Sequence, residues 1–326
     1  MRAIQCVKPG PPEDLVLANV PDLQPGAGEV RVSTRAMGVN FPDGLIIAGK
    51  YQYKPDLPFS PGAEAAGVVD AIGAGVTGVA LGDRVISMTI YGAFAEQVLT
   101  RADQLIPIPD AMPFDIAAGF TMTYGTSFYA LAQRGALQPG ETLLVLGAAG
   151  GVGLAAIEIA KAMEAKVIAA ASSDGKLALC REHGADDTIN YTTEALRDGI
   201  RRITPSGTVD LVYDPVGGPL AELALRSLAW GGRYLVIGFA AGEIPRFPAN
   251  LLLMKGTSAV GVFWGDFVAR EPAAHQANMR ALFELYAQGK LRPHIDRHFP
   301  LEQTPEAIRR VMDRQARGKV VVTAGG

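Results

Sequence analysis

Hydrophobic and polar positions change their pattern near residue 120. In the first 110 residues, short β-branched runs alternate with turns rich in Gly and Pro, as in EVRVSTRAMGVN, GVVDAIG and GDRVISM. Short runs between tight turns are typical of a β domain. Beyond residue 120, nearly continuous apolar runs are separated by segments of helix length. This second pattern predicts strands buried on both faces of a parallel sheet.

Six apolar runs between residues 142 and 264 predict the strands of that sheet. In order they are TLLVLG, KVIAAAS, DTINY, VDLVYDPVG, RYLVIGF and SAVGVFW. Six strands that alternate mostly with helices match a doubly wound α/β domain. The tail contains two helical stretches, HQANMRALFELYAQ and TPEAIRRVM, and a closing strand, KVVVTA. We expect the tail to return to the first domain, which divides the chain into 1–120, 121–264 and 265–326.

The composition is that of a globular protein with two domains. The 326 residues are 48% hydrophobic and 19% charged, whereas a disordered chain has fewer apolar residues and more charge. So long a chain rarely folds around a single core. The net charge of −3 provides no basic field, so we expect no nucleic-acid partner. Apolar stretches such as 153–171 contain several charged residues, so no membrane span of about 20 residues is expected.

The cysteines and the first residues indicate a cellular location. Cys6 and Cys180 are the two cysteines; two free thiols suit a reducing compartment and cannot supply a four-thiolate metal site. The first ten residues, MRAIQCVKPG, have no apolar run long enough for a signal peptide. We therefore expect a cytoplasmic protein.

The segment LVLGAAGGVG, residues 144–153, leads from a predicted strand directly into a glycine-rich turn. Gly147, Gly150 and Gly153 are spaced three residues apart where the next helix begins. In a dinucleotide-binding fold, the first glycine permits the tight turn, the second lets the backbone approach a pyrophosphate, and the third lets helix and strand pack closely. A tight turn without a ligand is the alternative, but the surrounding strand–helix units favour a dinucleotide site, whose phosphates face the helix N-terminus. The other expected coenzyme contacts in the turn are Ala149, Gly151 and Val152.

The end of the next predicted strand indicates which dinucleotide binds. NAD sites usually place Asp or Glu about 20 residues after the turn, where the carboxylate binds the ribose 2′-hydroxyl. Here that place holds Ala171, Ser172 and Ser173, followed by Lys176. Hydroxyl groups and an ammonium would bind a 2′-phosphate, which a carboxylate would repel. We therefore predict NADP (NADPH) as the coenzyme, with Tyr191 at the end of the third strand as a further phosphate ligand.

Two alternatives stay open at this position. Ser173 and Asp174 would also cap the helix that follows, and the same helix end can serve both purposes. Asp174 is a carboxylate and would instead face the adenosine ribose.

Several segments match a known pattern, in its order and over essentially the whole chain: GVNFPDGLIIAGKY (38–51), PFSPGAEAAGVV (58–69), GDRV (82–85), TYGTSFYAL (123–131) and GAAGGVG (147–153). Together they resemble the zinc-independent, zeta-crystallin-like quinone oxidoreductase branch of the medium-chain dehydrogenase/reductase superfamily. The resemblance implies an α/β protein with a Rossmann doubly wound parallel sheet and a GroES-like β-barrel domain made from both chain ends, with the coenzyme cleft at their junction.

The resemblance also implies that no metal is used. Zinc alcohol dehydrogenases of this superfamily carry a cysteine in the segment matching GVNFPD and a histidine in the one matching GAEAAG, where this chain has Asn40 and Ala63. An amide and a methyl group thus stand in place of thiolate and imidazole ligands. His294 and His298 have the spacing of a helical metal pair, but prolines flank them and the glutamate of HExxH is missing. We read them as surface or strand histidines.

Asn40 and Tyr51 are the catalytic residues that the resemblance implies. Hydride comes from the nicotinamide, so the protein must position the acceptor and stabilise charge on its oxygen. Asn40 would lie beside the nicotinamide ribose and donate to a ribose or substrate oxygen; a buried structural amide is the alternative. Tyr51 matches a cleft-lining tyrosine, with a phenolic proton to donate and a ring to stack on a flat acceptor. Tyr53 is a weaker candidate, because an extended segment would turn it to the opposite side.

Further coenzyme contacts are expected near the nicotinamide. Thr126 resembles the family residue on the nicotinamide side, with helix packing as the alternative. Ligands of such folds bind beyond the carboxyl ends of the strands, and VFWG at the sixth strand would equally suit a core or a dimer edge. The expected contacts at the ends of the fifth and sixth strands are Gly238, Phe239, Phe263 and Trp264.

We expect one more coenzyme contact in the tail and a dimer interface at the last Rossmann strand. Lys319, in GKVVV, would reach the coenzyme from the tail, and Arg314 is a weaker candidate; both would otherwise be solvated charges. Family members commonly pair through the last Rossmann strand, here 258–264, so we expect a homodimer.

These features predict a zinc-independent NADPH:quinone oxidoreductase, since reduced quinones need little acid–base chemistry. An enoyl-thioester or enone reductase of the same fold is the alternative, in which a tyrosine placed like Tyr51 protonates the α-carbon or stabilises the enolate. A second alternative is a non-catalytic NADP-binding sensor or structural protein, since crystallin-type relatives show such recruitment. The intact hydride-site residues argue against it.

Overall fold

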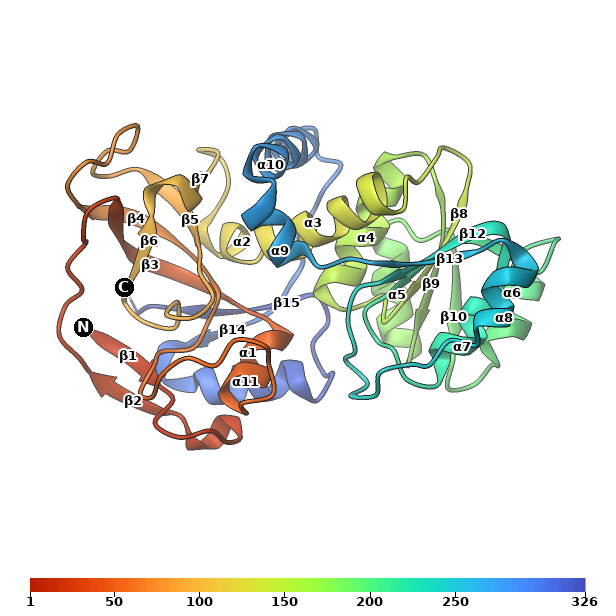
Figure 1. Cartoon of the computed structure of the whole chain (residues 1–326), viewed down its shortest axis with the longest axis horizontal. Coiled ribbons are helices and arrows are strands. Elements are labelled where there is room, and N and C mark those ends of the chain that lie inside the picture. Colours follow the sequence, from red (N-terminus) through yellow and green to blue (C-terminus); the bar gives the residue numbers. More distant parts are fainter. Residues whose placement is uncertain (326) are drawn as a thin grey trace. The chain divides into compact units, whose positions relative to one another are not determined.

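The computed structural model describes residues 1–325, and the chain divides into two compact units (Figure 1). The first unit comprises Met1–Thr121 and Ile295–Gly326, and the second comprises Met122–His294. The tail thus returns to the first unit, but thirty residues later than the predicted boundary at residue 265.

Residues 265–294 stay with the second unit because of specific side-chain packing. Phe267 stacks on Tyr129 with ring centroids 4.0 Å apart. Asn278 and Gln133 exchange two amide hydrogen bonds of 3.0 and 3.2 Å. Directly before this segment, Trp264 packs against Gly125, where an added methyl group would lie 3.0 Å from the indole ring.

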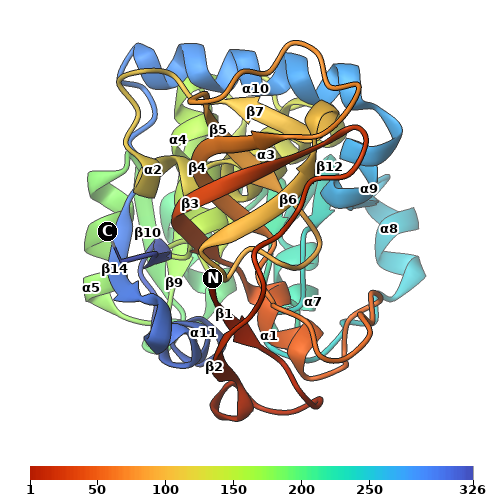
Figure 2. The same cartoon turned by 90° about the vertical axis from the view of Figure 1, so that its left-hand side faces the viewer.

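The first unit is built on a mixed sheet in which strands from both chain ends pair (Figure 2). Strand order is β14-β15-β3-β4-β5-β7, with β6 also paired to β3, and β1 and β2 form a separate two-stranded sheet. The tail strand β15 runs antiparallel to β3, with Val320 opposite Val39. The strands are β1 (Arg2–Gln5), β2 (Val16–Asn19), β3 (Glu29–Val39), β4 (Glu64–Ile72), β5 (Arg84–Met88), β6 (Gln97–Arg101), β7 (Leu105–Pro107), β14 (Ile295–Pro300) and β15 (Lys319–Thr323). The α-helices are α1 (Phe41–Ile47), α2 (Phe114–Ala118) and α11 (Thr304–Met312).

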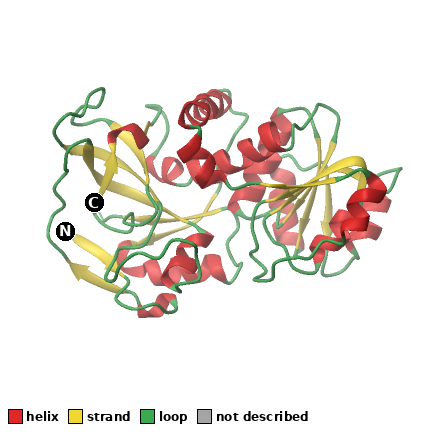
Figure 3. Ribbon diagram, viewed as in Figure 1, coloured by secondary structure: helices red, strands yellow, loops and turns green. Residues whose placement is uncertain are grey.

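The second unit contains a six-stranded, fully parallel sheet in the order β10-β9-β8-β11-β12-β13. This order confirms the predicted doubly wound sheet, and it reverses between β8 and β11, where ligands of such folds bind. Five of the six predicted apolar runs each contain one strand, whereas β12 begins five residues before its run, RYLVIGF; helices flank the sheet (Figure 3). The strands are β8 (Thr142–Leu146), β9 (Lys166–Ala171), β10 (Asp187–Asn190), β11 (Val209–Asp214), β12 (Leu228–Val236) and β13 (Ser258–Gly261).

Helices of the second unit cover a core that is apolar along whole strands. In β8, Leu143 to Leu146 are all fully buried, as the continuous apolar run predicts for a sheet covered on both faces. The helices are α3 (Thr121–Phe128), continued by a π-helical turn over Tyr129–Arg134, α4 (Gly151–Ala162), α5 (Asp174–Glu182), α6 (Leu196–Ile203), α7 (Leu220–Arg226), α8 (Ala249–Lys255), α9 (Trp264–Arg270) and α10 (Pro272–Ala287). None of the helices within residues 1–325 combines the length and apolar character that a membrane crossing needs.

Candidate functional site

The glycine turn between β8 and α4 has one position that is open and two that the protein's own packing requires. Gly147 has φ +58°, and a methyl group there would lie 2.7 Å from Val216. At Gly153 a methyl group would lie 2.5 Å from the Ala148 carbonyl oxygen. At Gly150 it would meet only the Gly147 carbonyl oxygen, at 3.4 Å. Gly150 therefore leaves space above bare backbone, which a ligand can approach closely.

The helix after this turn begins without a side-chain cap. Gly150 is the N-cap residue of α4, and the first turn of the helix, from Gly151 and Val152 onward, contains no acidic side chain. The first N–H groups of a helix have no partner within the helix and favour an anion. The turn therefore fits the phosphates of a dinucleotide.

Asp214, at the carboxyl end of β11, holds the loop that packs on Gly147. Its Oδ1 accepts hydrogen bonds from the N–H groups of Val216, at 2.7 Å, and Gly217, at 2.9 Å. The Tyr234 hydroxyl donates to the other oxygen. Burial raises the pKa of this carboxyl group, and the three hydrogen bonds lower it. Asp214 was not predicted from sequence, although an acid at the end of the apolar run VDLVYD is a usable signal.

The residues expected to bind a 2′-phosphate lie together where β9 leads into α5. Lys176 Nζ donates to Ser172 Oγ at 3.3 Å, and the Lys176 N–H donates to Ser173 Oγ at 3.4 Å. Ser173 is thus the N-cap residue of α5, as the capping alternative predicted. Asp174 accepts a 2.8 Å hydrogen bond from the Asn190 side chain, which engages one of its oxygens. The Tyr191 N–H donates to the Ala171 carbonyl, which fixes Tyr191 next to the end of β9.

Residues beyond the ends of β12 and β13 divide into exposed and buried ones. Phe239 and Phe263 are exposed, and Gly238 lies beside the loop after β11, its N–H directed at the Asp214 carbonyl. Trp264 is buried against Gly125 and the His275 ring. Trp264 was predicted as a coenzyme contact, with a core position or a dimer edge as alternatives. Its packing is that of a core residue.

Thr126 lies in a helix and Arg314 in a turn, and the contact of Thr126 with the coenzyme stays a prediction. Thr126 is buried on α3, and Arg314 is exposed in the turn after α11. His298 lies in β14 and pairs with Asp115 at 3.0 Å, and the His294 ring packs edge-on against His183. No group of three or more His, Cys, Asp or Glu side chains within the described chain could hold a metal ion.

In the first unit, Asn40 belongs to a buried polar cluster at the junction of β3, β4 and β15. Lys319, the first residue of β15, donates from Nζ to Asn40 Oδ1 at 2.6 Å and to Glu64 Oε2 at 3.0 Å. Lys319 is 6% exposed and Glu64 is fully buried. Gly38 makes room for both, since a methyl group there would lie 2.9 Å from Glu64 Oε2 and from Lys319 Cε. The ammonium is therefore held inside the unit rather than solvated, and its contact with the coenzyme stays a prediction.

This cluster fixes the orientation of the Asn40 amide. Its Nδ2 donates to the Gly38 carbonyl at 3.1 Å and to Glu64 Oε2 at 3.4 Å, which uses both amide hydrogens. Its Oδ1 accepts from Lys319 and retains one lone pair. The geometry thus presents Asn40 as an acceptor rather than as the predicted donor.

Asp43 lies directly behind Asn40, in the first turn of α1. Its Oδ2 accepts the Asn40 N–H at 2.7 Å, while its Oδ1 is buried without a hydrogen-bond partner among residues 1–325. Burial raises the pKa of this carboxyl group to about 7, against the lowering effects of the Asn40 hydrogen bond and the Lys319 charge. Neither Asp43 nor Glu64 was predicted from sequence. The signal for Glu64 was present, as a single charge in the apolar segment GAEAAGVV.

Tyr51 follows α1 and packs partly against the core of the first unit. Burial is the main cause of its raised pKa, and the Tyr53 and Asp43 charges add to it, so the phenol keeps its proton at neutral pH. Tyr53 is 42% exposed, with its ring centroid 6.0 Å from that of Tyr51. The two predicted catalytic residues thus belong to the first unit, and the predicted phosphate ligands belong to the second.

Comparisons with known proteins match nearly the whole chain. The family model "Alcohol dehydrogenase GroES-like domain" matches residues 26–110, and "Zinc-binding dehydrogenase" matches 151–285. Quinone oxidoreductase-like protein 2 of Mus musculus is 41% identical over 99% of this chain and 92% of its own. The quinone oxidoreductase of Pseudomonas aeruginosa is 35% identical over 98% and 99%. The structure of Escherichia coli quinone oxidoreductase complexed with NADPH aligns with a TM-score of 0.94 and 29% identity, over 99% of this chain and 100% of that one.

Proposed function

We propose that this chain, which belongs to the zinc-independent quinone oxidoreductase branch of the medium-chain dehydrogenase/reductase superfamily, is an NADPH-dependent reductase that transfers hydride to quinones. The observation that carries the proposal is the contact between Lys176 and Ser172 at the end of β9. An ammonium and two hydroxyl groups at this place suit a phosphorylated adenosine ribose.

The coenzyme would be held by the second unit in two places. The open backbone at Gly150 and the first N–H groups of α4 would bind the pyrophosphate. Ser172, Ser173 and Lys176 would bind the 2′-phosphate, while Asp174 is occupied by Asn190. The exposed rings of Phe239 and Phe263 would line the same end of the sheet.

NADPH, when bound, supplies the hydride, and residues of the first unit would prepare the acceptor. The Tyr51 ring would stack on a flat acceptor, and its phenol, protonated at neutral pH, would supply a proton where the reaction needs one. Asn40 Oδ1, oriented by Lys319, would accept a hydrogen bond from a ribose hydroxyl. Asp43 would hold the Asn40 backbone in place through its 2.7 Å hydrogen bond.

A reductase of enones or enoyl thioesters is the second candidate, because the raised pKa of Tyr51 suits this reaction equally. After hydride reaches the β-carbon, the α-carbon needs a proton, and one phenol would supply it. A reduced quinone carries its charge on oxygen, which water protonates readily. The two reactions therefore differ in how much they need Tyr51.

We predict that Tyr51→Phe lowers kcat/KM for an enal such as trans-2-hexenal about 100-fold, the usual contribution of a general acid. For 1,4-benzoquinone it should change kcat/KM by no more than about twofold, because no essential proton comes from the phenol. Steady-state rates at saturating NADPH measure both values. Tyr53→Phe is the matched control, since this neighbouring residue is 42% exposed.

Three outcomes of this assay would count against the assignments. If Tyr51→Phe leaves both rates level, Tyr51 serves neither reaction. If only enals and enones are reduced, the enone reductase replaces the quinone reductase as the function. Tight NADPH binding without turnover of any quinone or enone would instead favour a sensor.

We also propose that the protein forms a homodimer along β13. This strand is the edge of the parallel sheet, and an unpaired edge is a template for a second copy. Large apolar side chains are exposed nearby, with Trp230 at 81%, Leu253 at 83% and Met254 at 69%. Sedimentation equilibrium should give twice the chain mass of 34.3 kDa, and a monomer mass would contradict the proposal.

A further inference from the structure

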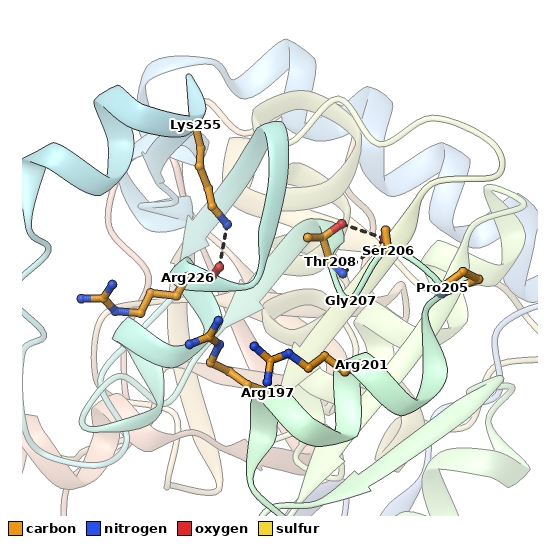
Figure 4. A pocket seen from close by; sticks show the side chains of 8 residues that line it. All are labelled: Arg197, Arg201, Pro205, Ser206, Gly207, Thr208, Arg226 and Lys255. Atoms are coloured by element: carbon orange, nitrogen blue, oxygen red, sulfur yellow. Dashed lines mark hydrogen bonds between the residues drawn. The ribbon is translucent and has the colours of Figure 1, made fainter.

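A basic pocket lies in the second unit, between α6, α7, α8 and the loop before β11 (Figure 4). Its volume is about 340 Å³. Four of its eight lining residues carry a positive charge and none carries a carboxylate. The lining residues are Arg197, Arg201, Pro205, Ser206, Gly207, Thr208, Arg226 and Lys255.

The pocket is distinct from the candidate coenzyme site. Residues 205–208 lead into β11, Arg226 precedes β12, and Lys255 precedes β13. The pocket therefore lies at the amino ends of these parallel strands. The glycine turn follows the carboxyl end of β8, at the opposite edge of the same sheet.

Two of the four cations have a structural explanation. Lys255 Nζ donates to the carbonyl oxygens of Arg226, at 2.6 Å, and Leu228, at 2.7 Å. Arg226 ends α7 and pairs with Glu222 at 2.6 Å. Cations are favourable near helix C-termini, where carbonyl groups lack partners. These two residues would therefore be expected without any ligand.

Arg197 lacks such an explanation. It is the second residue of α6, where the helix dipole disfavours a positive charge, and it forms no ion pair within the described residues. Arg201 lies four residues further along the same helix, so the two guanidinium groups repel each other. The ion pair of Arg201 with Asp198 is long, at 3.4 Å, and both side chains are exposed. Positive charge thus accumulates here beyond what the fold needs.

The charges act on one another across the pocket. Burial lowers the pKa of Lys255, and the charges of Arg197 and Arg226 lower it further. A bound anion would relieve this repulsion.

The loop before β11 adds hydrogen-bonding groups to the pocket wall. The hydroxyl groups of Ser206 and Thr208 hydrogen-bond to each other at 2.8 Å. Gly207, with φ +65°, lies against the side chain of Arg201, where a methyl group would be 3.1 Å from Cγ. The loop thus supports Arg201 and offers hydroxyl groups beside it.

We propose that this pocket binds the di- or triphosphate group of a small phosphorylated ligand. Guanidinium groups recognise phosphate oxygens through paired hydrogen bonds, and several cations favour a multiply charged group over a single phosphate. The volume is near the lower end for small-molecule sites, which fits two or three linked phosphates. Binding of a ligand in this pocket would not involve the candidate coenzyme site.

Calorimetry with tripolyphosphate tests this site in protein saturated with NADPH, so that the coenzyme phosphates already occupy their own positions. We expect binding, with inorganic phosphate weaker than tripolyphosphate. Arg197→Gln should weaken tripolyphosphate binding at least about tenfold, the effect of losing one charge-assisted contact. Arg202→Gln is the matched control, because Arg202 lies on the same helix outside the pocket and pairs with Glu194. It should leave binding unchanged.

Each outcome bears on the pocket itself. Absence of heat with tripolyphosphate, or equal binding by the Arg197→Gln variant and the unaltered protein, would overturn the proposal. Loss of binding in Lys176→Gln but not in Arg197→Gln would place the anion in the coenzyme site and equally overturn it. ATP binding more tightly than tripolyphosphate would identify the ligand as a nucleotide, and equal binding would identify a free polyphosphate; both support the site.

Discussion

Replacing Lys176 with Glu is expected to weaken NADPH binding about 100-fold while changing NADH binding by less than about threefold. The Lys176 ammonium lies 3.3 Å from the Ser172 hydroxyl, so a 2′-phosphate there would contact both groups. The substitution removes a charge-assisted hydrogen bond and places a carboxylate beside the phosphate. NADH has a hydroxyl group at this position and loses little.

Dissociation constants from quenching of protein fluorescence measure the preference directly. Lys166→Glu is the matched control, because Lys166 is exposed at the beginning of β9, whereas Lys176 lies in the helix that follows the end of this strand. It makes the same change of charge and should leave both coenzymes bound as before. Equal losses of NADPH and NADH in Lys176→Glu would show that Lys176 does not contact the 2′-phosphate.

The sheet of the second unit was predictable because its strands are apolar along their whole length. Runs such as TLLVLG and KVIAAAS are continuous because both faces of the sheet are covered. The glycine turn was predictable from local packing, because a side chain at Gly147 or Gly153 would clash with neighbouring atoms.

The extent of the second unit was harder to predict because its last contacts are few and distant in sequence. Residues 265–294 join it through Phe267 and Asn278, which pack on residues more than a hundred positions earlier. Nothing in the helical pattern of this segment specifies its partner. The pattern of apolar and polar residues alone therefore predicted a boundary at residue 265, whereas the second unit extends to His294.

The cluster around Asn40 could not be predicted for the same physical reason. Lys319 and Glu64 are 255 residues apart, and they meet only because β15 and β4 both pair with β3. Lysine at the start of a strand is usually solvated. The burial of Lys319 and the hydrogen bonds of both Asn40 amide hydrogens depend on how the strands pair, which the sequence pattern does not specify.

Lys319→Met should lower the free energy of unfolding by about 3–5 kcal/mol, because it breaks the buried ion pair with Glu64. Methionine fills similar space but leaves the Glu64 carboxylate buried without the ammonium. It also removes the 2.6 Å hydrogen bond that orients Asn40. Urea unfolding followed by circular dichroism measures the loss.

A double variant separates the ion pair from simple packing. Combining Lys319→Met with Glu64→Gln removes both charges, so it should recover part of the stability that the single substitution loses. If the double variant is no more stable than Lys319→Met, the buried carboxylate is not the cause. A loss below about 1 kcal/mol in the single variant would mean that the ammonium is exchanged for water at little cost.

The pH dependence of stability gives the same variant an independent test through Asp43. Its pKa is about 7 in the folded protein against an ordinary 3.8, so the folded state keeps a proton that the unfolded chain releases. The contribution of Asp43 to the free energy of unfolding is therefore greatest below about pH 4. It falls as the pH rises to about 7, and it no longer changes at higher pH. The Lys319 charge lowers the pKa of Asp43, so without it the fall should continue to higher pH. Urea midpoints between about pH 5 and 9 measure this, and profiles with the same shape in both proteins would show that the two charges do not interact.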